Sequence, residues 1–68
     1  MGKGNIHIKL YGNGQFMGYV KRISTYYGKV DSTPSIENAK SYSKAETAAT
    51  EGELIRAMTH GALNYEVI

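Results

Sequence analysis

The amino-acid sequence predicts a small α+β domain, with an antiparallel sheet of three to four strands (β-β-β-α-β) and one helix packed on one face. Three observations predict it. Apolar and polar residues alternate on both sides of an Asn-Gly pair, a longer segment has apolar residues at helical spacing, and the alternation returns at the end of the chain. Because 68 residues suffice for only one hydrophobic core, residues 1–68 are predicted to form a single domain.

The first predicted element is a β-hairpin. Residues 5–11 and 16–23 each alternate as half-buried strands do, and Asn13-Gly14 lies between them. Asn and Gly tolerate the positive φ angles that both central residues of a type I′ turn require, so the pair predicts such a turn. The turn would fix the register, with Tyr11 opposite Phe16, Leu10 opposite Met17, Ile8 opposite Tyr19 and Ile6 opposite Lys21.

This register sorts the hairpin side chains onto two faces of the sheet. The face expected to carry the core consists of Ile6, Ile8, Leu10, Met17, Tyr19 and Ile23. The opposite face, which we call the open face, is expected to carry His7, Lys9, Tyr11, Phe16, Val20 and Arg22, with Gly18 opposite Lys9. Aromatic rings among basic side chains are unusual on a solvent-facing surface.

The rest of the sheet is predicted from weaker signals. The segment from Ser24 to Ser35 is rich in turn-forming residues and is interpreted as a connection. Ile36 to Tyr42 is interpreted as a third strand, because Ile36 and Tyr42 fall on the same side of an alternating segment. The alternation of Leu63 to Ile68 predicts a final strand.

Between these strands, Ser43 and Glu46 have the spacing of a capping box, which predicts a helix from Lys44 to about His60. Gly61 is expected to adopt the left-handed conformation that often follows a helix.

An apolar stripe runs along this predicted helix, and Gly52 lies within it, so we expect Gly52 to make a close contact between helix and sheet. The stripe consists of Ala45, Ala48, Ala49, Gly52, Ile55, Met58 and Ala62, whereas Glu46, Glu51, Glu53 and Arg56 are expected to face water.

Composition argues against several classes of protein. There is no Cys, which excludes a disulfide framework and a thiolate zinc site. His7 and His60 lie on different predicted elements without carboxylates at ligand spacing, so we expect no metal and no cofactor. No nucleophile motif is present, and we predict a protein that is not an enzyme. The absence of a long apolar segment predicts no membrane span, and the absence of a signal-peptide stretch after Met1 favours an intracellular protein.

The candidate binding residues are the aromatic and basic side chains of the open face and of the segment after it. They are Lys9, Tyr11, Phe16, Arg22, Tyr26, Tyr27 and Lys29. Such side chains suit a protein interface, and they also suit base stacking and phosphate contacts. A net charge of only +2 favours the protein partner. For Tyr26 and Tyr27, an alternative of equal weight is that one of them covers the end of the small core.

The second half of the chain has a layout shared with other small proteins. Ala39 to Glu46 lead into the predicted helix, and Tyr65 to Ile68 end the predicted final strand. This layout, the small size and the absence of Cys resemble small proteins of bacteriophages and mobile elements, the anti-CRISPR proteins among them. The resemblance implies a cytoplasmic inhibitor that binds a bacterial defence or nucleic-acid-processing complex and blocks its nucleic-acid-handling surface.

Two other functions remain open. The first is a small nucleic-acid-binding protein that uses the open face directly. The second is a structural subunit that self-associates, as a homodimer, through its sheet.

Overall fold

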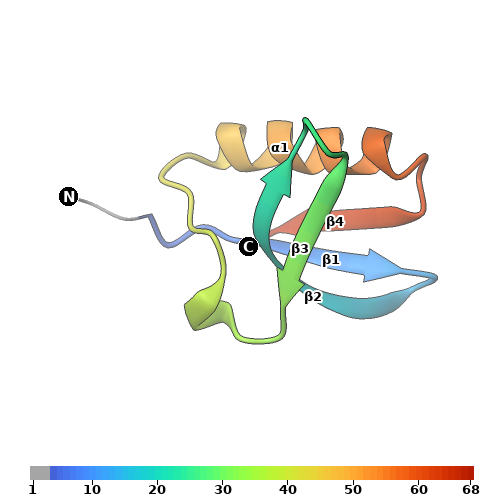
Figure 1. Cartoon of the computed structure of the whole chain (residues 1–68). Coiled ribbons are helices and arrows are strands. Elements are labelled where there is room, and N and C mark those ends of the chain that lie inside the picture. Colours follow the sequence, from blue (N-terminus) through green and yellow to red (C-terminus); the bar gives the residue numbers. More distant parts are fainter. Residues whose placement is uncertain (1–3) are drawn as a thin grey trace.

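The computed structural model describes residues 4–68; the first three residues, which bear on the expected absence of a signal peptide, lie outside this range. It confirms the α+β class, because one helix packs against an antiparallel sheet with the strand order β3-β2-β1-β4 (Figure 1). The elements are β1 (Ile8–Gly12), β2 (Gln15–Ser24), β3 (Lys29–Thr33), a short 3₁₀ helix η1 (Ile36–Asn38), α1 (Ala45–Met58) and β4 (Leu63–Val67).

The turn between β1 and β2 is the predicted one. Asn13 and Gly14 have φ angles of 53° and 77°, as a type I′ turn requires. The neighbouring pairs are Gly12 with Gln15 and Tyr11 with Phe16, so the predicted register is confirmed beside the turn.

The register then shifts by one residue, because β2 contains a β-bulge. Leu10 lies opposite Gly18 rather than Met17, and Lys9 lies opposite Tyr19 rather than Gly18. The predicted pairs of Ile8 with Tyr19 and Ile6 with Lys21 are therefore wrong as well; Ile6 instead forms an isolated bridge with Tyr42. A bulge inserts one extra residue into one strand and exchanges the faces of the residues that follow it. A second register shift, between Val20 and Arg22 in the pairing of β2 with β3, returns Arg22 and Ile23 to their predicted faces.

The exchange of faces changes the composition of the core. Val20, expected on the open face, is fully buried, whereas Met17, expected in the core, is 49% exposed. Tyr19 moves to the open face beside Lys9. Gly18 has a φ of 104°, which side-chain-bearing residues rarely adopt, and a Cβ there would stand 3.0 Å from the Thr33 carbonyl oxygen. A glycine at this position therefore permits the bulge.

The third strand is not where the sequence predicted it. It spans Lys29–Thr33, inside the segment interpreted as a connection, whereas the segment from Ile36 to Tyr42 contains η1 and the single bridge to Ile6. β3 forms because β2 is long enough to extend past β1 and offer its second half as a pairing partner. A strand with one large apolar residue depends on such pairing more than on its own propensity.

The core lies between the helix and the concave side of the sheet. Figure 1 shows β2 curving away from β1, so that the β2–β3 hairpin stands across β1 and β4. The buried apolar residues are Ile8, Leu10, Val20, Tyr42, Ala48 and Ile55. Ile6, Ile23, Val30, Leu63, Tyr65 and Val67 pack around them, so Ile6, Ile8, Leu10 and Ile23 occupy the core side as expected.

Both ends of α1 differ in detail from the prediction. Lys44 is the N-cap without a side-chain hydrogen bond, so the capping box of Ser43 and Glu46 does not form. The helix ends at Met58, and Gly61 has a φ of 81°, so its expected left-handed conformation is confirmed. His60, with a φ of 54°, is the first left-handed residue after the helix.

Two backbone hydrogen bonds define the C-terminal cap of α1. The Gly61 N–H donates to the Arg56 carbonyl at 2.8 Å, and the His60 N–H donates to the Ala57 carbonyl at 3.2 Å. These bonds are the pattern of a Schellman motif, with His60 rather than a glycine at its left-handed residue.

The inner surface of α1 is made mainly of small residues. Ala48, Gly52 and Ile55 are buried as predicted, although Ala45 and Ala62 are exposed. A Cβ on Gly52 would overlap the ring of Tyr65 and stand 2.6 Å from its Cγ. The predicted close contact of Gly52 with the sheet is therefore confirmed, and its partner is the Tyr65 ring of β4.

Candidate functional site

The open face carries a compact group of three rings and one ammonium group, which we call the open-face cluster: Lys9, Tyr11, Phe16 and Tyr19. The Phe16 ring centroid lies 6.4 Å from that of Tyr11 and 5.2 Å from that of Tyr19, both in edge-to-face geometry. The Lys9 Nζ lies 5.6 Å from the Tyr11 ring centroid and 5.5 Å from the Phe16 ring centroid. These distances are typical of aromatic and cation–π contacts.

The strands place each member of the cluster. Lys9 and Tyr11 alternate along β1 with the buried residues Ile8 and Leu10, so their side chains point away from the core. Phe16 lies directly across from Tyr11, and the bulge brings Tyr19 opposite Lys9.

An acidic residue of β4 borders the open-face cluster. Glu66 pairs with Lys9 across the β1–β4 ladder, and the Tyr11 hydroxyl donates a hydrogen bond of 3.0 Å to Glu66 Oε1. The Tyr11 hydroxyl and, to a smaller extent, the Glu66 carboxylate raise the pKa of the Lys9 ammonium above its usual value. Lys9 is therefore firmly positively charged at neutral pH. Lys9 and Glu66 together carry no net charge. The open-face cluster and the bordering Glu66 therefore form an aromatic surface with one basic and one acidic side chain.

The other candidate residues lie on the β2–β3 hairpin. The Arg22 Nε is 4.0 Å from Asp31 Oδ2 on the neighbouring strand, and both side chains are largely exposed. Tyr26 and Tyr27 occupy the hairpin tip with ring centroids 4.8 Å apart, and they are 88% and 74% exposed. Their exposure contradicts the alternative that they cover the core. Lys29 is the first residue of β3 and is exposed.

The structure therefore groups the seven candidate residues into two sets. Lys9, Tyr11 and Phe16 contact one another. The remaining four lie on the second half of β2, at the tip of the β2–β3 hairpin and at the start of β3. Within residues 4–68, no aromatic or cation–π contact links the tyrosines of the tip to the open-face cluster.

Sequence reasoning missed two residues of this surface. Tyr19 was assigned to the core because the bulge was not anticipated, and Gly18 is the signal that marks it. Glu66 was missed because its contact with Tyr11 depends on β4 pairing with β1, which one sequence does not reveal.

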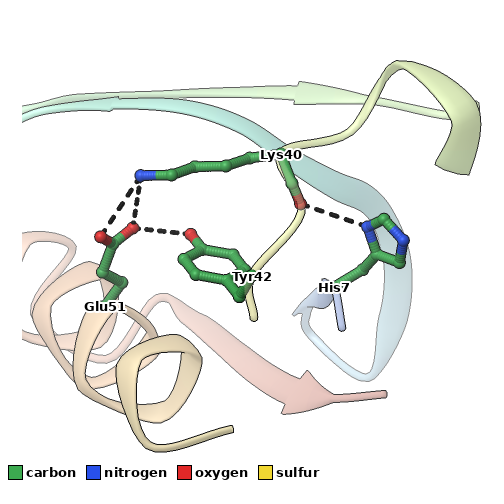
Figure 2. A network of polar contacts seen from close by, with 4 residues as sticks. All are labelled: His7, Lys40, Tyr42 and Glu51. Carbon is green, nitrogen blue, oxygen red and sulfur yellow. Dashed lines mark hydrogen bonds and ion pairs between the residues drawn. The ribbon is translucent and has the colours of Figure 1, made fainter. Parts of the chain in front are cut away.

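A polar network joins the segment after η1 to the helix (Figure 2). The hydroxyl of the buried Tyr42 donates a hydrogen bond of 2.6 Å to Glu51 Oε1. The Lys40 Nζ donates to the two Glu51 carboxylate oxygens at 3.0 and 3.3 Å. On the other side, the His7 ring lies with Nδ1 3.2 Å from the Lys40 carbonyl oxygen. Glu51 was expected to face water, but it is half-buried within this network.

The network shifts two pKa values in opposite directions. Burial and the hydrogen bond to Glu51 raise the pKa of the Tyr42 hydroxyl far above its usual value. For Glu51, burial opposes ionisation, but the hydrogen bonds from Tyr42 and Lys40 outweigh it and hold the pKa below its usual value. A neutral tyrosine and a carboxylate are therefore both retained at neutral pH. This network tethers the segment to the helix, and no pocket opens beside it within residues 4–68.

The described residues contain no group of three or more His, Asp and Glu side chains arranged to hold a metal ion. Among them, α1 is too short and too polar to cross a membrane. No protein-family model, curated protein or solved structure matches this chain.

Proposed function

We propose that this protein is a binding module, without catalytic activity of its own, that recognises a protein partner through the open-face cluster. The observation that carries the proposal is the position of Phe16: its ring contacts Tyr11, Tyr19 and Lys9, yet 47% of the residue remains exposed. Mutual contacts hold the rings in place before binding, which lowers the entropic cost of forming an interface. Aromatic residues with a neighbouring base are typical energetic anchors of protein interfaces.

The charge of the cluster favours a protein over a nucleic acid. Glu66 lies beside Lys9 and accepts the Tyr11 hydrogen bond, so a phosphate at Lys9 would meet a nearby carboxylate. Nucleic-acid affinity depends on neutralising several phosphates, and a balanced pair of charges does little of this. A protein surface with both polar and apolar groups complements the cluster better.

The resemblance to anti-CRISPR proteins extends the proposal to the class of partner. On this basis, the partner is a bacterial defence or nucleic-acid-processing complex, and binding blocks the surface that handles nucleic acid. The sheet would then act as a stoichiometric inhibitor, with the rings of the open-face cluster inserted into the partner.

The test is an affinity capture from bacterial lysate with the tagged protein, in nuclease-treated and untreated arms. Phe16→Ala removes the central ring, and Met17→Ala is the matched control because Met17 is exposed to nearly the same extent, at 49%, on the same strand. We expect a protein partner that is retained by the wild type and by Met17→Ala, lost with Phe16→Ala, and unaffected by nuclease. Equal capture by all three proteins would contradict the proposal.

The nuclease and salt arms separate the nucleic-acid alternative. If the captured material is nucleic acid and its binding weakens steeply with salt, the open face is a nucleic-acid surface instead. A protein interface of balanced charge is expected to depend only weakly on salt.

A further inference from the structure

β3 forms one edge of the sheet, and no other strand among residues 4–68 pairs with its outer side. It is the terminal strand in the order β3-β2-β1-β4. Within residues 4–68, the backbone hydrogen bonds of Lys29–Thr33 are confined to the ladder with β2. An open edge of this kind is a template for a further strand unless its side chains prevent pairing.

The side chains of β3 determine which strand could join it. Val30 packs toward the core, so Lys29 and Asp31, two residues apart, both project from the opposite face. They carry opposite charges. Lys29 takes part in none of the ion pairs within residues 4–68, and Asp31 has only the long contact with Arg22.

A second copy of the same strand complements this arrangement. If two β3 strands pair antiparallel about a twofold axis at Val30, Lys29 of each copy lies opposite Asp31 of the other. Shifting the axis to Asp31 would place two carboxylates opposite each other, which is unfavourable. We propose that this protein forms a homodimer by antiparallel β3–β3 pairing about Val30, with a cross-strand ion pair between Lys29 and Asp31 at each side.

The same register accounts for the exposed hairpin tip. Antiparallel pairing about Val30 places Gly28 of each copy opposite Ser32 of the other copy and Tyr27 opposite Thr33, so the hairpin tip lies at the end of the partner strand. The tyrosine rings would then lie at the dimer contact. Arg22 would extend the row of charges, because it is already beside Asp31.

This dimer is independent of the proposed partner site. None of the four cluster residues lies on β3, although Tyr19 pairs with Thr33 at the end of that strand, so binding by the cluster does not require dimerisation. A contact of one short strand per copy is at the small end of protein interfaces, and we expect a dissociation constant on the order of 100 µM.

Exchanging the charges of Lys29 and Asp31 tests the proposed β3–β3 register. The dissociation constant of the dimer is measured by sedimentation equilibrium over a range of protein concentrations. Lys29→Asp would place two carboxylates opposite each other, and Asp31→Lys would place two ammonium groups opposite each other. Each single variant is expected to dimerise at least about tenfold more weakly. An equimolar mixture of these two variants restores complementary pairs, so we expect a heterodimer as strong as the wild-type dimer, and likewise a dimer of the double variant Lys29→Asp/Asp31→Lys.

Two controls make the test specific. Glu37→Lys makes the same change of charge as Asp31→Lys at an exposed residue of η1, and it should leave dimerisation unchanged. Phe16→Ala should also leave it unchanged, because Phe16 lies in the open-face cluster. A protein that is monomeric throughout the millimolar range, or a dimer that the single variants do not weaken, would overturn the proposal. A dimer that Phe16→Ala abolishes would overturn it too.

Discussion

Replacing Gly52 by Ala should destabilise this protein, although the same change stabilises most helices. Gly52 lies within α1, where Ala has a higher helix propensity by about 1 kcal/mol. A Cβ at this position would overlap the Tyr65 ring and stand 2.6 Å from its Cγ, well inside van der Waals contact. Moving the ring away would strain or break the hydrogen bond of 2.6 Å that the Tyr65 hydroxyl donates to Glu53 Oε2.

The magnitude follows from these opposing effects. Overpacking of a close contact costs about 1–3 kcal/mol. After the gain in helix propensity, we expect Gly52→Ala to lower the free energy of unfolding by up to about 2 kcal/mol. The larger Gly52→Leu should cost more.

Urea denaturation followed by circular dichroism measures this change, and a double-mutant cycle isolates its cause. In a Tyr65→Ala background the ring is absent, so Gly52→Ala should become stabilising by about 1 kcal/mol. Ala57→Gly, at an exposed position of the same helix, calibrates the propensity alone. If Gly52→Ala raises the urea midpoint with Tyr65 intact, the helix–sheet contact does not have the geometry described above.

Three further predictions concern the turn, the helix end and the polar network. Gly14→Val forces a β-branched residue to a φ of 77° and should cost about 1–2 kcal/mol in urea denaturation; an unchanged midpoint would contradict the type I′ turn. His60→Gly should add about 0.5–1 kcal/mol, because glycine adopts the left-handed C-cap position without strain, and a lowered midpoint would refute this. The raised pKa of Tyr42 means that its contribution to stability is present below its usual pKa of 10.0 and is lost as pH rises above it, since only the unfolded state then releases the proton. The lowered pKa of Glu51 makes its contribution decline as pH falls below the usual value of 4.5. Tyr42→Phe should flatten the alkaline dependence of the urea midpoint, and an unaltered dependence would argue against the network.

The features that the sequence predicted are those fixed by local interactions. The Asn13-Gly14 turn, the helix and the final strand each have a local signal, and the structure contains all three. Gly52 was placed correctly because helical spacing put it in the apolar stripe.

The features that the sequence did not predict depend on tertiary pairing. The bulge exchanges the faces of Met17 and Val20, and alternation alone cannot distinguish the two registers. The strand Lys29–Thr33 contains only one large apolar residue, so it has little strand signal before β2 pairs with it. For the candidate site, alternation along β1 predicted Lys9 and Tyr11, but the positions of Tyr19 and Glu66 follow from the bulge and from the β1–β4 pairing.

Site-specific photo-cross-linking would show whether the open-face cluster contacts a protein partner. A benzophenone-bearing phenylalanine analogue would replace Phe16, whose ring lies at the centre of the cluster, or Leu54, which is exposed on α1. After illumination in bacterial cells, we expect one dominant protein adduct from position 16 and none of that mass from position 54. The adduct should disappear when Lys9→Ala and Tyr11→Ala are added. Adducts of equal yield from both positions, or from position 54 alone, would contradict the assignment of the open face as the binding surface.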